Sequence, residues 1–413
     1  ARMRTILVLV CLGVVAALPI DSTTTSLVRV NITSQAVLDV LDQPGVDVWS
    51  DGWGVGASVD VNADPSLLKQ LSTLHVVDKV IIPDVAELIR TEAMRRSGLA
   101  KGGFFDDYRT FEEITERLQQ YAKDYDAEFI SSIGESIEGR KIPAIRFGRR
   151  AGMTPFSDEA LPTVWLQCGI HAREWISPAT CMYFTEQLLK QGANSTNGVL
   201  DHLQIILAPV VNPDGYAFTH SDDRLWRKNR RNNGDGTFGV DLNRNWGDHW
   251  GGGGSSGHPG SETYRGPKAF SEPETEAIVQ FLRTEKANGA VIRSAIDFHA
   301  YGQLILRPYG WEMPNKGVPE NDAEAKRIGD DMRDTIYKVH GKKYTSEHSA
   351  ELYVAAGGAD DWLGSTGTDG HIAYTIELRD TGSYGFLLPP EQIVPTGEEI
   401  YQAMLGFLEA SAK

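Results

Sequence analysis

A histidine and a glutamate directly after one apolar stretch are the first residues in this sequence that could do chemistry. Residues 164–170 are mostly apolar and predict a buried strand, and His171 and Glu174 follow it within four positions. Open α/β sheets bind ligands at the carboxyl ends of their strands. Because imidazole nitrogens and carboxylate oxygens both bind zinc, this His-x-x-Glu pair is a candidate for two metal ligands. By itself, so short a pattern is not specific.

A second histidine in an equivalent position supplies a third ligand. Residues 291–298 predict another strand, and His299 follows it directly. Two histidines and one glutamate would leave one coordination position open, which is typical of a catalytic rather than a structural zinc site. Asp241 is a candidate for the carboxylate that orients a ligating histidine. The alternatives are an ordinary core or surface histidine and an ordinary turn cap.

The strand expected at residues 372–377 presents a further carboxylate. Alternation puts Ala373, Thr375 and Glu377 on one face, so that two small residues lead to one acid. This pattern is typical of a pocket wall with a general base at its mouth. A solvated or salt-bridged glutamate is the alternative.

Charge indicates what kind of substrate group such a site would bind. The chain has a formal net charge of −16, which argues against a nucleic-acid partner. Several arginines nevertheless accompany the candidate site, and a guanidinium grips a carboxylate bidentately. We therefore expect an anionic group on the substrate. The arginines are Arg173, Arg224, Arg227 and Arg244.

Strands and helices alternate along most of the chain, which predicts an α/β domain whose mixed sheet is covered on both faces. The strands are expected at residues 128–133, 141–147, 164–170, 203–211, 291–298, 304–306 and 372–378, and the helices at 111–125, 177–190, 272–286, 322–340 and 390–408. A smaller α/β unit is expected before this domain. Its strands are expected at residues 26–32, 55–61 and 76–82, and its helices at 35–41, 66–74 and 84–95.

The N-terminal part of the chain predicts secretion in a precursor form. A short apolar run ending in small residues is typical of a signal peptide, which we place at residues 1–18. No later apolar run is long enough to span a bilayer. Residues 95–103 are basic and glycine-rich, which suits cleavage by a trypsin-like protease. We therefore predict a propeptide domain at 19–101 and a catalytic domain at 102–413; a plain interdomain linker is the alternative.

Few cysteines are available to stabilise the fold. Of three, Cys11 lies in the expected signal peptide. We interpret Cys168 and Cys181 as buried free thiols, with a bridge between them as the alternative. Asn31 and Asn194 each begin a glycosylation sequon.

Together these motifs resemble the zinc metallocarboxypeptidases of the digestive procarboxypeptidase A/B group, in zymogen form. The resemblance implies a mixed eight-stranded sheet sandwiched by helices, preceded by a small α+β, ferredoxin-like prodomain. It also implies one Zn²⁺ per chain, and we expect a monomer. The matching segments span nearly the whole large domain: residues 171–175, 212–215, 224–228, 241–246, 261–264, 299, 353, 361–362 and 377–382.

The resemblance implies a role for each site residue in cutting the C-terminal bond of peptides and proteins. Zinc would be held by His171, Glu174 and His299, with Asp241 behind them. Glu377 would be the general base, and Arg227 would stabilise the oxyanion. The C-terminal carboxylate would be bound by Asn243 and Arg244 and covered by Tyr353, and Arg173 is a further candidate for substrate binding.

The side-chain preference depends on one position. Counted from Tyr353, Asp360 falls where basic-specific members of the family carry an aspartate. A buried carboxylate left unpaired against an apolar side chain would cost about 3–5 kcal/mol, so we predict release of C-terminal Lys and Arg. One alternative is that Asp360 points elsewhere and Asp361 takes the charge role. Another is a preference for apolar or aromatic C-terminal residues. His348 is expected near the same pocket.

The sequence departs from the family in one place, and two other functions are alternatives. The family's usual disulfide has no counterpart, since Phe238 and Gly260 stand where its cysteines would be. A catalytically inactive binding relative is disfavoured because the catalytic and substrate-binding residues are all present. A zinc hydrolase of small acylated amino acids has no evident need for a cleavable prodomain.

Overall fold

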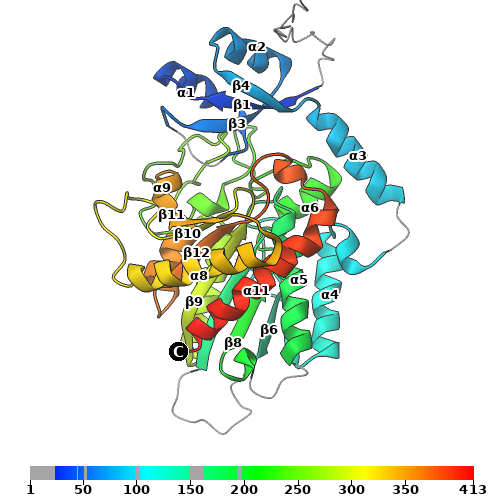
Figure 1. The fold of residues 1–413 in the computed structure, drawn as a ribbon, viewed down its shortest axis with the longest axis vertical. Coiled ribbons are helices and arrows are strands. Elements are labelled where there is room, and N and C mark those ends of the chain that lie inside the picture. The colour runs from blue at the N-terminus through cyan, green and yellow to red at the C-terminus, as the bar shows by residue number, and fades with distance from the viewer. Residues whose placement is uncertain (1–23, 44, 51–53, 99–101, 149–160, 193–197) are drawn as a thin grey trace, which may run out of the picture.

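The computed structural model describes residues 24–43, 45–50, 54–98, 102–148, 161–192 and 198–413. The expected signal peptide, residues 99–101 of the basic segment and the sequon at Asn194 lie outside the described residues. Figure 1 shows a small domain above a large one, with a single helix running between them.

The small domain is a four-stranded antiparallel sheet in the order β2-β3-β1-β4. Its βαββαβ sequence is the ferredoxin-like arrangement, as predicted. Alternate residues such as Val28, Val30, Val59 and Val61 are buried in its core. The elements are β1 (Ser26–Asn31), α1 (Gln35–Leu41), β2 (Asp47–Val48), β3 (Ser58–Ala63), α2 (Pro65–Thr73), β4 (Val77–Ile82) and the connecting helix α3 (Val85–Gly98).

The large domain contains a mixed eight-stranded sheet in the order β11-β10-β12-β9-β7-β8-β6-β5, which confirms the predicted fold. The four central strands β12, β9, β7 and β8 are mutually parallel. Strand β11 has no counterpart among the expected ranges. The strands are β5 (Ala127–Ile130), β6 (Ala144–Gly148), β7 (Leu161–Cys168), β8 (Gln204–Ala208), β9 (Ala290–His299), β10 (Leu304–Arg307), β11 (Thr345–His348) and β12 (Ile372–Glu377).

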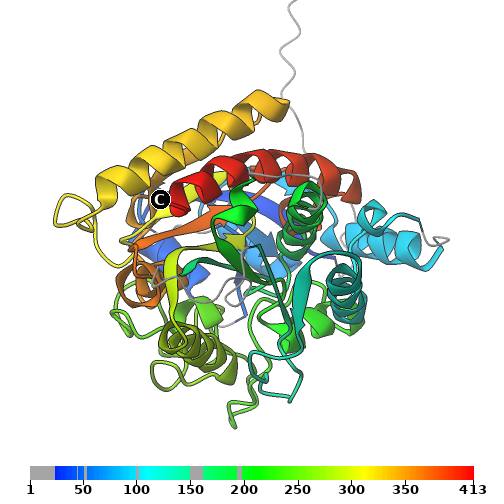
Figure 2. The same ribbon diagram turned by 90° about the horizontal axis from the view of Figure 1, so that it is seen from below.

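Helices cover both faces of this sheet, as expected (Figure 2). On one face lie α4 (Phe111–Asp124), α5 (Ile176–Gly192), α8 (Asp322–His340) and α11 (Ile393–Ser411). On the other lie α7 (Pro273–Ala287) and the short α10 (Ala359–Trp362), with the loop around Trp246. The shorter helices are α6 (Pro213–Ser221) and α9 (Ser349–Leu352).

Alternation along the central strands decides which residues can reach the site. In β9, Ile296 and Phe298 join the core under α5 and α11, whereas Ala295 joins the core under α7 and α10. Because successive side chains point to opposite faces of a strand, Asp297 and His299 share the face of Ala295.

The two remaining cysteines form a disulfide, so the interpretation as free thiols was wrong. Cys168 ends β7, and Cys181 lies on α5, which packs directly on that strand. Their Cα atoms are 6.8 Å apart, and both residues are fully buried in the same core. The sequence could not decide this, because a separation of 13 residues is compatible with either state.

None of the helices that the structure describes is both long enough and apolar enough to cross a membrane.

Candidate active site

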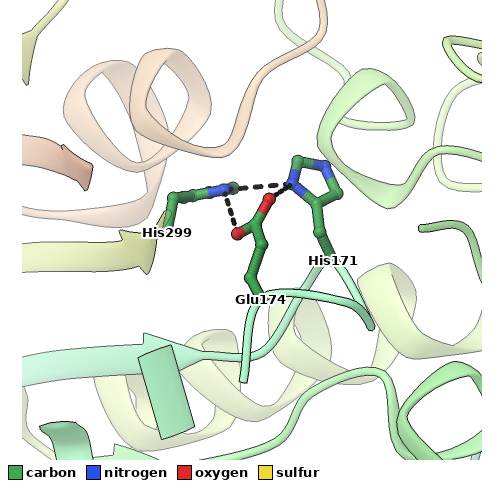
Figure 3. Close-up of side chains that lie close together, drawn as sticks. All are labelled: His171, Glu174 and His299. Atoms are coloured by element: carbon green, nitrogen blue, oxygen red, sulfur yellow. Dashed lines mark hydrogen bonds and ion pairs between the residues drawn. The ribbon is translucent and has the colours of Figure 1, made fainter. Parts of the chain in front are cut away.

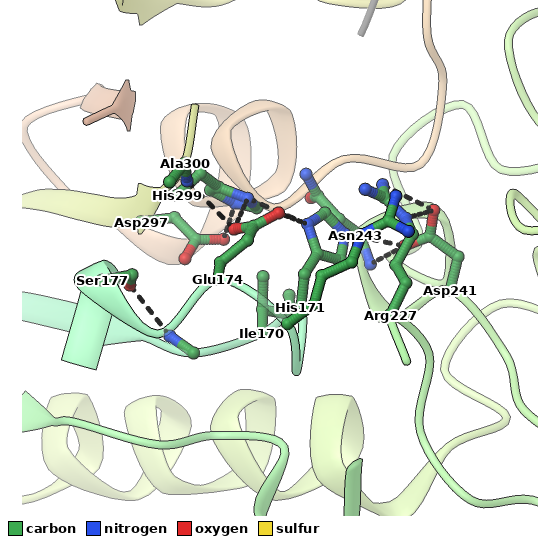
Figure 4. Close-up of polar contacts among 12 residues, drawn as sticks. Ile170, His171, Glu174, Ser177, Arg227, Asp241, Asn243, Asp297, His299 and Ala300 are labelled. Carbon is green, nitrogen blue, oxygen red and sulfur yellow. Dashed lines mark hydrogen bonds and ion pairs between the residues drawn. The ribbon is translucent and has the colours of Figure 1, made fainter. Parts of the chain in front are cut away.

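A tight exit from the sheet positions the first two candidate ligands. Gly169 leaves β7 with φ +64°, and a Cβ there would lie 3.1 Å from Pro178 and 3.3 Å from the carbonyl of Pro209. Glycine suits this left-handed, crowded position. Ser177 Oγ accepts a hydrogen bond from the Gly169 amide (3.1 Å) and donates one to the carbonyl of Phe298 (2.5 Å; Figure 4). The loop after β7 is thereby fastened to the end of β9.

Three buried side chains converge where these two strands end (Figure 3). His171 Nδ1 lies 2.8 Å from Glu174 Oε1, His299 Nδ1 lies 3.3 Å from Glu174 Oε2, and the two Nδ1 atoms are 3.1 Å apart. Burial alone would raise the pKa of Glu174, but the two imidazoles outweigh it and hold the pKa well below its usual range. Two imidazole nitrogens and a carboxylate facing one another form a donor set that fits zinc.

The outward-facing nitrogen of each histidine lies beside another buried carboxylate (Figure 4). His171 Nε2 is 3.1 Å from Asp241 Oδ1, and Arg227 Nη2 donates to Asp241 Oδ2 at 3.0 Å. Burial opposes ionisation of Asp241, yet Arg227 and His171 keep its pKa well below the usual value. His299 Nε2 is 3.1 Å from Asp297 Oδ2. Asp297 is not among the predicted site residues, although its place two residues before His299 on the same strand face is visible in the sequence.

The two histidines line a pocket together with most of the predicted site residues. Thr375 and Glu377 lie on one wall, as their alternation predicted, and Glu377 pairs in register with His299 on the neighbouring strand. The lining residues include Arg227, Asn243, Arg244, Leu306, Gly310, Ser349, Leu352, Tyr353, Ala355, Gly358, Asp360, Thr375 and Glu377.

Arginine 244 forms the cationic end of this pocket. Its guanidinium donates to the carbonyls of Gly254 (2.9 Å) and Asn243 (2.8 Å) and to the hydroxyl of Tyr353. The side chain of Asn243 is oriented by the Ala359 amide, which donates to its Oδ1 at 2.8 Å. These contacts hold the arginine and the amide at one end of the pocket, where they can receive an anion.

The two neighbouring aspartates of α10 differ in their surroundings. Asp360 lines the pocket and accepts a hydrogen bond from Ser349 Oγ at 2.6 Å. Burial raises its pKa, and the bond from Ser349 offsets part of that rise. Asp361 instead accepts bonds from the backbone amides of Gly310 (2.9 Å) and Trp311 (3.2 Å).

His348 and Arg173, both expected at or near the site, form contacts elsewhere. His348 turns away: its ring nitrogens lie 2.8 Å from the Pro308 carbonyl and 3.2 Å from Asp322. Arg173 faces the small domain. It donates to Asp47 Oδ1 (2.7 Å) and to the carbonyl of Val48 (3.3 Å).

The fold and the site together define an α/β protein with a candidate zinc centre, and comparison with known proteins identifies its family. Residues 114–403 match the zinc carboxypeptidase family. The chain belongs to this family, and zinc is its cofactor. It is therefore a carboxypeptidase, an enzyme that acts on peptides.

Several relatives resemble the chain over most of its length. It is 38% identical to carboxypeptidase B of Astacus astacus over 72% of this chain and 94% of the relative. It is 34% identical to rat (Rattus norvegicus) carboxypeptidase A1 over 91% and 90% of the two chains. Among solved structures, thrombin-activatable fibrinolysis inhibitor aligns with a TM-score of 0.82 at 28% identity, covering 94% of this chain and 98% of that one.

Proposed function

We propose that this enzyme is a secreted carboxypeptidase zymogen that, once cleaved, releases C-terminal lysine and arginine from peptides. The observation that carries the preference is the contrast between the two aspartates of α10. Asp361 lies outside the pocket lining and accepts bonds from two backbone amides, whereas Asp360 lines the pocket beside Ser349. A cationic side chain of the substrate would form an ion pair with the Asp360 carboxylate. Relatives named carboxypeptidase A and B both match, so their names do not decide the preference.

We further propose how the residues of the pocket share the reaction. Zinc, when bound, polarises the scissile carbonyl and makes a water molecule more acidic. Glu377 takes the proton from the attacking water and passes it to the leaving amine. Arg227, oriented by Asp241, donates to the developing oxyanion. Arg244 and Asn243 hold the C-terminal carboxylate, so that the last peptide bond is the one presented to Glu377.

The first test follows release of C-terminal Arg and C-terminal Phe from matched peptides after limited trypsin treatment. We expect release of Arg, and we expect a zinc chelator to abolish it and added zinc to restore it. Release of Phe in preference to Arg would overturn the proposed pocket and leave the carboxypeptidase intact. Release of neither residue by folded, zinc-loaded protein would favour an inactive binding relative.

We also propose that residues 19–101 are an inhibitory propeptide, removed by cleavage near Arg96–Lys101. Arg173 supports this proposal, because Asp47 and Val48 of the small domain occupy its guanidinium. A cavity of about 530 Å³ between the domains is lined by Val48 on one side and by Arg227, Arg244 and Tyr353 on the other. Substrate entering from this side would have to displace the small domain.

Replacing Asp47 with alanine is expected to raise the activity of the uncleaved protein about tenfold to hundredfold. Asp47 and Arg173 form a charge-assisted hydrogen bond. Losing such a bond weakens the contact between the two domains by about 1.5–3 kcal/mol. The measurement is peptide hydrolysis by the uncleaved variant. After trypsin treatment the variant and the wild type should be equal, because Asp47 leaves with the small domain.

The matched control is Asp64→Ala. Asp64 caps α2 by accepting a bond from the Leu67 amide at 2.7 Å, so its loss weakens the small domain without touching Arg173. If Asp64→Ala raised the basal activity as much as Asp47→Ala, general loosening rather than the ion pair would explain inhibition.

A further inference from the structure

A buried carboxylate in the middle of the large sheet has no evident structural purpose. Asp297 lies on the central strand β9, and its side chain is 0% exposed. Its in-register neighbours are Gln167 on β7 and Thr375 on β12. Around it lie the apolar side chains that pack under α7 and α10. Burying a charge in such a place costs several kcal/mol unless a partner compensates it, so the position needs an explanation.

Within the described part of the chain, the candidate partner of Asp297 is one of the proposed metal ligands. Asp297 Oδ2 lies 3.1 Å from His299 Nε2, and among the described residues no other cationic group lies within 4 Å of this carboxylate. The contact has the distance of an ion pair without the alignment of a good hydrogen bond. Neither Gln167 nor Thr375 donates to the carboxylate among the bonds that the structure describes.

We propose that Asp297 is a positioning residue, which holds His299 so that Nδ1 faces the metal. The inference rests on the proposed assignment of His171, Glu174 and His299 as zinc ligands. By accepting the Nε2 proton, Asp297 fixes the tautomer in which Nδ1 carries the free lone pair, and it increases the basicity of that nitrogen. Asp241 stands in the same relation to His171 at the same distance of 3.1 Å. Each histidine of the site therefore has its own carboxylate.

The arrangement also explains why an acid is tolerated on β9. Asp297 and His299 are two residues apart on one strand, so their side chains lie side by side on one face. Strand β9 itself therefore places the Asp297 carboxylate beside the His299 imidazole. For His171, which lies in a loop, the carboxylate has to come from elsewhere, and Asp241 approaches from the loop before Leu242–Arg244.

The test measures zinc affinity rather than activity. Full-length Asp297→Asn protein is stripped of metal, and its zinc dissociation constant is determined by competition with a chelating dye. We expect zinc binding to weaken about 10- to 100-fold, as is typical when a carboxylate behind a histidine ligand is lost. Asp241→Asn should give a loss of similar size. Asp297→Ser provides a second, smaller replacement if the asparagine variant does not fold.

Two further measurements separate positioning from a structural role. Glu274→Gln removes a buried carboxylate that lies outside the pocket, and it should leave zinc affinity nearly unchanged. Metal-free Asp297→Asn should melt close to metal-free wild type, because the amide oxygen has nearly the same shape and can still accept a hydrogen bond from His299 Nε2. Zinc affinity equal to wild type, or a metal-free protein destabilised in proportion to the loss of zinc, would overturn the inference.

A His299→Ala variant tests whether His299 is a zinc ligand at all. His299→Ala should lose stoichiometric zinc. If this variant bound zinc as the wild type does, His299 would not be a ligand, and the proposed site would fall together with the role of Asp297. If His299→Ala lost zinc while Asp297→Asn kept full affinity, only the role of Asp297 would be wrong.

Discussion

Replacing Glu377 with glutamine is expected to lower kcat for peptide hydrolysis by about 10²–10⁴, the usual contribution of a general base. Glu377 ends β12 and lines the pocket beside the two histidines. The amide has nearly the same shape as the carboxylate but cannot accept the proton. Since Glu377 is not one of the three converging donors, the variant should retain one zinc per chain.

The measurement combines kcat and zinc content on the same trypsin-activated preparation. Glu274→Gln is a matched control, because Glu274 is a buried glutamate outside the pocket. Burial raises its pKa to about 7. Glutamine resembles the protonated form that this residue partly adopts at neutral pH, so the control should keep its activity. A Glu377→Gln enzyme within about tenfold of wild type would contradict the assignment, because a general base contributes more than that. Loss of zinc together with activity would show that Glu377 supports the metal instead.

Much of the fold could be predicted because apolar periodicity is strong where elements are long. Helices α1 and α8 have the bounds that their sequence periodicity predicts. Strand β3 begins three residues later than expected, because Gly54 and Gly56 form a turn that leaves Val55 60% exposed. Strand β11 was missed because Thr345–His348 is polar. It forms as an edge strand, paired in parallel with β10.

Site residues could be predicted from the sequence only where they directly follow a recognisable strand. His171, Glu174 and His299 follow apolar strands, and so each was visible in the sequence. The surroundings of Arg173 depend on how β2 of the small domain packs on the large one, and no local pattern encodes that contact. Asp361 and Asp360 are adjacent in sequence and differ only in their hydrogen-bond partners. Their different environments are a property of the folded loops around α10.

Replacing Asp360 with asparagine is expected to lower kcat/KM for C-terminal Arg by about 10²–10⁴ and to raise the value for C-terminal Phe. The estimate follows from about 3–5 kcal/mol for removing one partner of a buried ion pair and about 1.4 kcal/mol per factor of ten. The amide can still accept the bond from Ser349, so the loop should keep its position. The measurement is kcat/KM on matched Arg and Phe peptides.

Asp361→Asn is the control for this prediction. It removes a carboxylate one residue away whose oxygens are bound by the amides of Gly310 and Trp311. If Asp360 binds the cationic side chain, the control should keep the preference for Arg, whatever it does to stability. An equal loss of preference in both variants would indicate a diffuse electrostatic effect of α10 rather than a specific partner.

The pH dependence of the preference provides an independent test of Asp360. Burial raises the pKa of its carboxyl above the usual value for aspartate. In the free enzyme the Asp360 carboxyl is therefore neutral at low pH and becomes negatively charged as the pH rises through this raised pKa. Since only the ionised carboxylate attracts a guanidinium, the ratio of kcat/KM for Arg to that for Phe should increase with pH in the wild type. In Asp360→Asn the ratio should be flat over the same range, because the group that titrates has been removed.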